Sequence, residues 1–251
     1  MADGVRDAGT VDPEDVARFD RLGERWWDEN GPMGKLHEIN PVRLRYLTDL
    51  VAARLPRAGG AAGSLAGLDI IDIGCGGGIL AEPLARLGGS VTGIDPAPGN
   101  IATAQSHAER AGLGIDYRST TAEDIAAEGR RFDLVLALEV VEHVADRDTF
   151  VATVAGLVRP GGLAVFSTLN RTARSYLLAI VGAEYVLRWL PRGTHRWSQF
   201  VTPDELSRSL RAAGLKPCGL TGMTYDPLRR DWRLGADTAV NYFLAASRPG
   251  D

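Results

Sequence analysis

The sequence predicts an α/β fold: a doubly wound, mostly parallel sheet of seven strands, preceded by an N-terminal helical extension. From Leu68 onward, short runs of branched apolar residues alternate with helical stretches, and strands that alternate with helices form parallel sheets covered on both faces. A glycine-rich turn follows the first apolar run, and Gly88 and Gly112 stand where helices should end. These observations favour one α/β sheet domain.

The elements are expected at defined places along the chain. The predicted strands are 68–73, 90–95, 115–119, 132–139, 163–168, 217–224 and 239–247, the last two forming a closing hairpin. Asp12-Pro13 and Asn40-Pro41 predict helix starts, because in each a capping side chain precedes a proline. Thr202-Pro203-Asp204-Glu205 is a capping box that predicts a later helix.

These elements divide the chain into a few parts. Residues 1–11 are expected to be a disordered tail and 12–57 the N-terminal helical extension. Residues 68–248 form the sheet domain, in which 171–200 is read as an insertion.

Composition excludes several classes of protein. A net charge of −4 over 251 residues gives no indication of nucleic-acid binding. Cys75 and Cys218 form no disulfide framework, which is typical of a reducing cytoplasm. The acidic N-terminus does not resemble a signal or transit peptide. No apolar run reaches the roughly 18 residues that span a bilayer.

The segment "DIGCGGG", Asp72–Gly78, places four glycines in the first strand-to-helix turn. In a doubly wound sheet this turn is the usual contact of a ligand. Ile79 stands where the dinucleotide fingerprint needs glycine, so a dehydrogenase is disfavoured. Asp95 ends the second strand, where a carboxylate can accept both hydroxyls of a ribose. Together the loop and Asp95 favour a ligand that contains adenosine.

Five segments follow one another along the sheet domain: "LDIIDIGCGGG", "VTGID", "TTAEDI", "FDLVLALEVVEHV" and "LVRPGGLAVFSTLN". In this order they resemble the motifs of class I S-adenosylmethionine-dependent methyltransferases. Four further segments are "RWWDENG", "LHEINPVRLRYL", "STLNRTARSYLLAIVGAEYVLRWLPRGTH" and "VNYFLA". With them, the sequence is more similar still to the ubiquinone-biosynthesis O-methyltransferase family. This resemblance runs from about Phe19 to Ala246.

The resemblance implies S-adenosylmethionine as cofactor and a role for individual residues. Gly74 would lie against its methionine part, and Arg43 would pair with the methionine carboxylate. Gly76, in the same loop as Gly74, would also bind the cofactor. Asp95 would hold the ribose. Ala122 would lie near the adenine, and Leu138 would close over the cofactor.

Glu139, Glu142 and His143 come directly after the fourth strand. If the chain is helical there, they share one face, and two carboxylates with an imidazole can bind a divalent cation. The resemblance suggests that some members hold magnesium at these positions. Alternatively, His143 or Glu142 acts as general base, or all three serve packing and hydrogen bonding.

Residues 171–196 combine five arginines and one acid with many apolar and aromatic residues. This composition suits a membrane interface with anionic lipid, and it equally suits a lid over the active site. We therefore expect a cytoplasmic protein. If the segment binds lipid, the protein is peripheral at the inner face of the cell membrane; if it is a lid, the protein itself buries the segment.

The expected activity is O-methylation of polyprenylated phenol or catechol rings in ubiquinone biosynthesis. It would cover both O-methylation steps, on 2-polyprenyl-6-hydroxyphenol and on 3-demethylubiquinol. The alternatives are methylation of another small phenol or a lipid, and a catalytically silent scaffold in a quinone-biosynthesis complex. The glycine loop, Asp95 and Arg43 argue against the scaffold.

Overall fold

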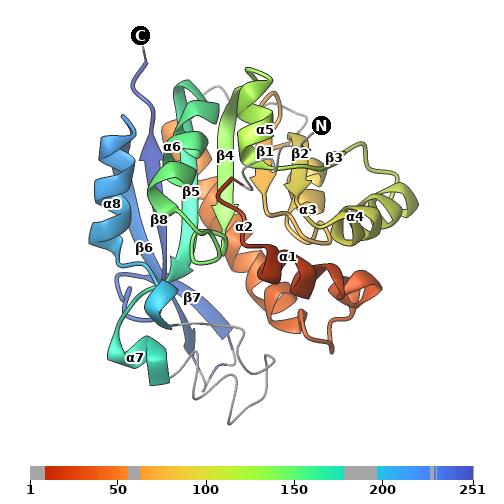
Figure 1. The fold of residues 1–251 in the computed structure, drawn as a ribbon, viewed down its shortest axis with the longest axis horizontal. Coiled ribbons are helices and arrows are strands. Elements are labelled where there is room, and N and C mark those ends of the chain that lie inside the picture. Colours follow the sequence, from red (N-terminus) through yellow and green to blue (C-terminus); the bar gives the residue numbers. More distant parts are fainter. Residues whose placement is uncertain (1–8, 56–62, 178–196, 227–228, 230, 251) are drawn as a thin grey trace, which may run out of the picture.

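The computed structural model describes residues 9–55, 63–177, 197–226, 229 and 231–250. Its centre is one sheet in the order β3-β2-β1-β4-β5-β8-β6-β7 (Figure 1). The strands are β1 Asp69–Ile73, β2 Ser90–Asp95, β3 Asp116–Ser119, β4 Phe132–Leu138, β5 Val158–Leu169, β6 Lys216–Asp226, β7 Asp231–Gly235 and β8 Asn241–Ser247. The helices are α1 Pro13–Asp20, η1 Gly23–Trp27, α2 Gly34–Arg54, α3 Ala81–Arg86, α4 Pro98–Arg110, α5 Ala122–Ala127, α6 Arg147–Leu157, α7 Ala173–Ser175, η3 Trp197–Gln199 and α8 Pro203–Ala212.

The predicted α/β class is confirmed, but the sheet has eight strands where seven were expected. β1 to β5 are parallel, and β8 inserts antiparallel between β5 and β6. The additional strand β7 pairs antiparallel with β6 at the edge of the sheet. The two runs expected to form a hairpin do pair, as β6 and β8, but β7 lies between them in the chain.

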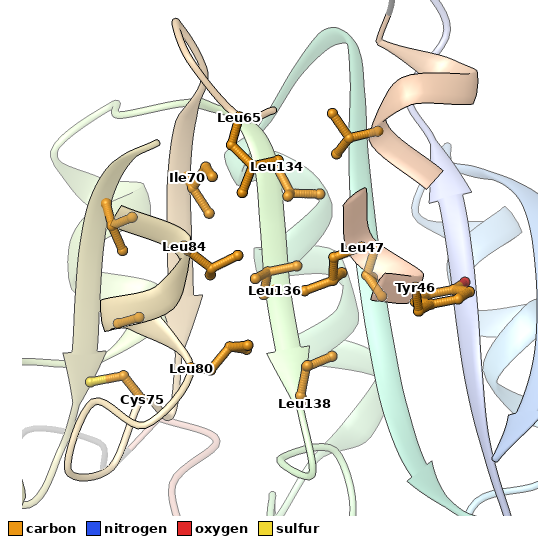
Figure 2. Close-up of a cluster of buried hydrophobic side chains, with 14 of the residues drawn as sticks. Tyr46, Leu47, Leu65, Ile70, Cys75, Leu80, Leu84, Leu134, Leu136 and Leu138 are labelled. Carbon is orange, nitrogen blue, oxygen red and sulfur yellow. The ribbon is translucent and has the colours of Figure 1, made fainter. Parts of the chain in front are cut away.

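Two hydrophobic layers cover the sheet, one on each face. Side chains of α2, α3 and α4 pack on the first face with those of the strands, and Figure 2 shows Leu47 of α2 close to Leu134 and Leu136 of β4. Side chains of α5, α6 and α8 pack on the second face. Both faces are therefore buried, which explains why all seven residues of β4 are buried and six of them are apolar.

The second N-terminal helix differs from the prediction. α2 begins at Gly34, not at Asn40-Pro41, and Pro41 lies inside it. Asn40 does not cap a helix, because its amide nitrogen donates to the carbonyl of Ile79, 2.8 Å away. The side chain that suggested a helix start therefore ties α2 to the segment after the glycine loop.

The first N-terminal segment crosses the carboxyl ends of the parallel strands. Asp12 caps α1 through the amide of Glu14, as predicted. Helix α1 then ends, and η1 follows as a separate turn. We call residues 9–27 the N-terminal strap. Of the disordered tail expected at 1–11, residues 1–8 lie outside the described residues. Thr10 is buried and Val11 bridges Val144, so these two residues are packed on the protein.

The insertion expected at 171–200 is described only at its two ends, since 178–196 lie outside the described residues. Among the residues that the structure does describe, no helix combines the length and apolar character needed to cross a membrane.

Candidate functional site

A cavity of about 830 Å³ lies at the carboxyl ends of the parallel strands. The N-terminal strap covers it, and it extends across the sheet from the ends of β2 and β3 to β6, β7 and β8. Eight of the residues singled out from the sequence line it together: Arg43, Gly74, Asp95, Ala122, Leu138, Glu139, Glu142 and His143. Ligands of doubly wound sheets bind in this place.

The glycine loop faces the cavity, and it is also packed closely against side chains of the protein. Gly74 lines the cavity in the left-handed region, at φ 71°, and a Cβ there would meet Val140 at 2.7 Å. A Cβ at Gly76 or Gly77 would lie within about 2.5 Å of the Trp26 side chain. Trp26 of the strap therefore accounts for two of the four glycines. Gly76, predicted to bind the cofactor, is not among the residues that line the cavity.

Asp95 organises the loops at its end of the cavity. Its Oδ2 accepts the amide of Gly76 at 3.0 Å, while Oδ1 accepts the amide of Ala97 at 2.9 Å and the side chain of Asn100 at 3.1 Å. Burial raises the pKa of Asp95, although these hydrogen bonds oppose the shift. A carboxylate has about four lone-pair sites, so Asp95 keeps capacity for one further donor.

Ala122 and Leu138 supply apolar walls. Ala122 is the first residue of α5, which Thr121 and Asp124 close with a reciprocal capping box. Leu138 is the last residue of β4 and is also buried. Both positions follow from the strand-helix alternation, which brings the ends of β3 and β4 to the same edge of the sheet.

Arg43 and Asp72 are two buried ionisable residues that line the cavity. Arg43 comes from α2 and Asp72 from β1. Arg43 Nε and Asp72 Oδ2 are both buried, and neither atom has a hydrogen-bond partner among the described residues. Burial raises the pKa of Asp72 to about 7, although the charge of Arg43 lowers it. Unpaired buried polar atoms are costly, which suits a site that a charged ligand completes.

Glu139 occupies an unusual backbone conformation directly after β4. Its φ is 57°, and it is the one non-glycine residue of the described chain with a positive φ. Its carboxylate accepts the Ser167 hydroxyl at 2.7 Å and contacts Arg43 Nη2 at 3.3 Å. A strained backbone of this kind costs on the order of 1–3 kcal/mol. The conformation turns the carboxylate toward the cavity and Arg43.

Glu142 is a buried carboxyl group. Thr168 of β5 donates its hydroxyl to Glu142 Oε2 at 2.8 Å. Burial, together with the charge of Glu139, raises the pKa of Glu142 to about 7, although Thr168 opposes the shift. Glu142 can therefore exchange a proton near neutral pH.

His143 is held by the N-terminal strap. Its Nδ1 lies 2.8 Å from Oδ2 of Asp15 on α1, and Phe19 packs edge-on against its ring at 5.6 Å. Burial lowers the pKa of His143, but the hydrogen bond to Asp15 and the charge of Glu142 outweigh it and raise the value overall. When Nδ1 carries the proton that Asp15 accepts, Nε2 of the neutral ring is a proton acceptor.

The three predicted metal ligands do not converge. The chain after β4 is a turn and not the helix that would have placed them on one face. Glu139 contacts Ser167 and Arg43, Glu142 contacts Thr168, and His143 contacts Asp15. No group of three or more His, Cys, Asp or Glu residues within the described ranges could hold a metal ion. The arrangement in this structure therefore does not fit the predicted magnesium site.

The described end of the basic segment carries paired arginines. Arg171 forms an ion pair with Glu205, and Arg174 pairs with Asp237 at 2.6 Å. Arg188, Arg192 and Arg196 lie outside the described residues. Tyr176, Leu177 and Trp197 are 46%, 58% and 41% exposed, which makes them the large apolar side chains at this surface.

Asp72, Asp15 and Trp26 also line the cavity, although they were not among the residues predicted for the site. Asp72 carried a signal, since it is an acid in a mostly apolar run directly before the glycine loop. Asp15 and Trp26 carried none, because only the path of the strap over the sheet brings them to the cavity.

Comparison with known proteins adds to this geometry. The methyltransferase domain family matches residues 39–218. The chain is 57% identical to the ubiquinone biosynthesis O-methyltransferase of Azorhizobium caulinodans, with 94% of this chain and 93% of that protein covered. It is 56% identical to the protein of the same name from Methylobacterium sp. strain 4-46, with 96% of each covered.

Solved structures agree on the fold. The magnesium protoporphyrin IX methyltransferase of Synechocystis, with bound S-adenosylmethionine, has a TM-score of 0.59 at 19% identity and covers 97% of this chain and all of its own. An S-adenosylmethionine-dependent methyltransferase from Thermotoga maritima scores 0.58 at 17% identity, with 92% and 99% covered. The fold, the cavity and the identity of 56–57% over nearly the full length of both relatives lead to one conclusion: the chain is an S-adenosylmethionine-dependent methyltransferase that belongs to the ubiquinone biosynthesis O-methyltransferase family.

Proposed function

We propose that this enzyme methylates ring hydroxyls of polyprenylated phenols or catechols in ubiquinone biosynthesis. We assign it both O-methylation steps, on 2-polyprenyl-6-hydroxyphenol and on 3-demethylubiquinol. The observation that carries the proposal is the single cavity that joins the predicted cofactor residues to Glu142 and His143 and then continues to β6 and β7. The names of the relatives support the substrate class.

The buried residues Arg43 and Asp72 fit the methionine part of S-adenosylmethionine, which carries a carboxylate and an ammonium group. Arg43 would pair with the carboxylate and Asp72 with the ammonium, which would satisfy the two unpaired buried atoms. Gly74 would allow close approach of this part of the ligand. Asp95 would accept from the ribose with its remaining lone pair, and Ala122 and Leu138 would contact the adenosine.

Bound S-adenosylmethionine supplies an activated methyl group on its sulfonium, so the protein has to align and deprotonate the accepting hydroxyl. A phenol pKa near about 10 leaves little phenolate at neutral pH. His143 would take the proton at Nε2, while Asp15 holds Nδ1 and stabilises the imidazolium that forms. Glu142 is the second candidate for the base, because its pKa lies at about 7.

A divalent cation at Glu139, Glu142 and His143 stays a prediction, and no step above uses one. In this arrangement a cation would have to displace the contact of Glu139 with Ser167. Loss of activity in excess chelator, restored by magnesium, would support the cation. Full activity in chelator would leave the three side chains with the roles described here.

We also propose peripheral binding to anionic membranes through the surface next to residues 178–196. The exposed side chains of Tyr176, Leu177 and Trp197 support this. The pairing of Arg171 and Arg174 with acids weakens it, since paired arginines attract anionic lipid less. The alternative is that this segment forms a lid over the active site.

Two measurements test the function. Calorimetry with S-adenosylmethionine separates an enzyme from a silent scaffold, which would not bind it. Methyl transfer to a short-chain polyprenyl catechol then tests the substrate class. Turnover of simple phenols at the same rate, with no preference for the prenylated ring, would favour the alternative of another small phenol.

A further inference from the structure

The cavity contains a second pair of unpaired polar atoms, on strands that β4 and β5 separate from Asp72 of β1. Trp232 Nε1, on β7, and Asn241 Oδ1, on β8, are buried and have no hydrogen-bond partner among the described residues, and both side chains line the cavity. Buried polar atoms without partners are rare in proteins, and each asks for an explanation. A ligand that binds in the cavity is one.

Sheet register places the two side chains on the same face. Asn241 is paired with Leu169 of β5, which also lines the cavity. Trp232 is paired with Tyr225 of β6, and the two rings lie 5.3 Å apart. Directly paired residues of antiparallel strands point to one face, and Met223, two positions before Tyr225, is on the face that α2 covers.

This end of the cavity is remote from the predicted adenosine site. Asp95 ends β2 and Ala122 follows β3, on one side of the sheet. Trp232 and Asn241 lie on β7 and β8, on the other side of β4 and β5. The turn with Glu142 and His143 follows β4, between the two. A ring that presents a hydroxyl to this turn therefore extends toward β8 and β7.

We propose that Trp232 and Asn241 form the ring-recognition pair of the enzyme, which binds the oxygen substituents of the substrate ring that are not being methylated. The inference rests on the proposed function and names residues for its specificity. The indole N–H can only donate, and the amide oxygen can only accept. A free ring hydroxyl suits both, because it accepts one hydrogen bond and donates another. An ether oxygen could pair with Trp232 alone.

The pair should select rings by their second oxygen. A site built to hydrogen-bond a hydroxyl rejects an analogue that lacks it, since its own polar atoms then stay buried and unpaired. The apolar neighbours Met223 and Leu169 offer no substitute partner. We expect a prenylated catechol to bind roughly 10- to 100-fold more tightly than the matching prenylated monophenol.

The test measures binding of a short-chain prenylated catechol and of the matching monophenol by calorimetry, with S-adenosylhomocysteine present. The variants are Trp232→Phe, which keeps an aromatic ring and removes the N–H, and Asn241→Leu, which keeps the size and removes the amide. Leu220→Ala, an exposed position on β6, controls for disturbance of the sheet. S-adenosylhomocysteine affinity of each variant reports whether the cofactor site is intact.

We expect each variant to lose most of the preference for catechol while monophenol and cofactor affinities stay within about twofold. Equal affinity of the unmodified enzyme for both rings would overturn the proposal, even if a variant fails to fold. So would variants that keep the full preference. If neither ring binds the enzyme although S-adenosylhomocysteine does, the proposed substrate class fails, and this result differs from a lost preference.

Discussion

Asp95 has two tasks, since it fixes the glycine loop and faces the cavity. Its carboxylate already accepts from Gly76, Ala97 and Asn100. We expect Asp95→Asn to weaken S-adenosylmethionine binding by about 1–3 kcal/mol, because a charged acceptor for the ribose is lost. Calorimetry measures the affinity, and thermal unfolding separates it from loss of the fold. Unchanged affinity would show that Asp95 serves the loops alone.

Asp72 makes stability depend on pH. Burial holds its pKa at about 7 in the folded protein, against an ordinary value of 3.8. Between these values the folded state keeps a proton that the unfolded chain has lost, so the stability contributed by this group is full at low pH and is lost as pH rises toward 7. Glu142 acts with the same sign.

We expect Asp72→Asn to flatten this dependence. Relative to the unmodified protein, the variant should gain up to about 3 kcal/mol in the free energy of unfolding between pH 5 and pH 8. Urea unfolding at the two pH values measures the change. Asp49→Asn, at an exposed position of α2, is the matched control. Parallel pH profiles for Asp72→Asn and the unmodified protein would contradict the shifted pKa.

At the scale of elements, α1 supports the proposed base from outside the sheet domain. Asp15→Asn should lower the turnover number roughly tenfold, because general-base catalysis contributes about 100-fold or more and an unsupported His143 loses part of it. Affinity for S-adenosylmethionine should hardly change. Glu14→Gln, at the neighbouring exposed position of α1, is the control in steady-state kinetics. An equal effect of both substitutions would indicate a general loss of α1.

Most elements could be predicted from the sequence because their signals are local. The apolar runs of β1 and β4 and the capping residues Asp12 and Thr202 act within a few positions. β7 could not, since only Trp232 and Leu234 of its five residues are apolar and its pairing with β6 is decided by the sheet edge.

The residues of the site that stand at strand ends could be predicted as well. Gly74, Asp95 and Leu138 stand at strand ends, and parallel topology alone brings strand ends together. The side chains of Glu139, Glu142 and His143 could not be placed, because the positive φ of Glu139 turns the chain away from the expected helix. Contacts of the strap, such as Trp26 on Gly76, depend on the packing of segments far apart in the sequence.

At the scale of the whole molecule, the exposed apolar side chains near residues 178–196 make membrane binding testable. We expect the enzyme to float with vesicles that contain anionic lipid, less so at high salt because of screening. Tyr176→Ser combined with Leu177→Ser should reduce flotation and spare methylation of a short-tailed substrate. Leu220→Ala, exposed on β6, is the control. No flotation of the unmodified enzyme would favour the interior lid.

The N-terminal strap also sets an order of assembly. Four hydrogen bonds anchor it to the sheet domain. Trp27 donates to the carbonyl of Gly77, and the amide of Gly99 donates to Asp20. Thr10 donates its hydroxyl to Glu123, and Asp15 is hydrogen-bonded to His143. All four anchors lie later in the chain than the strap, so the strap cannot complete these contacts until residue 143 has been made. The roof of the cavity therefore cannot close during synthesis before β4 has been made.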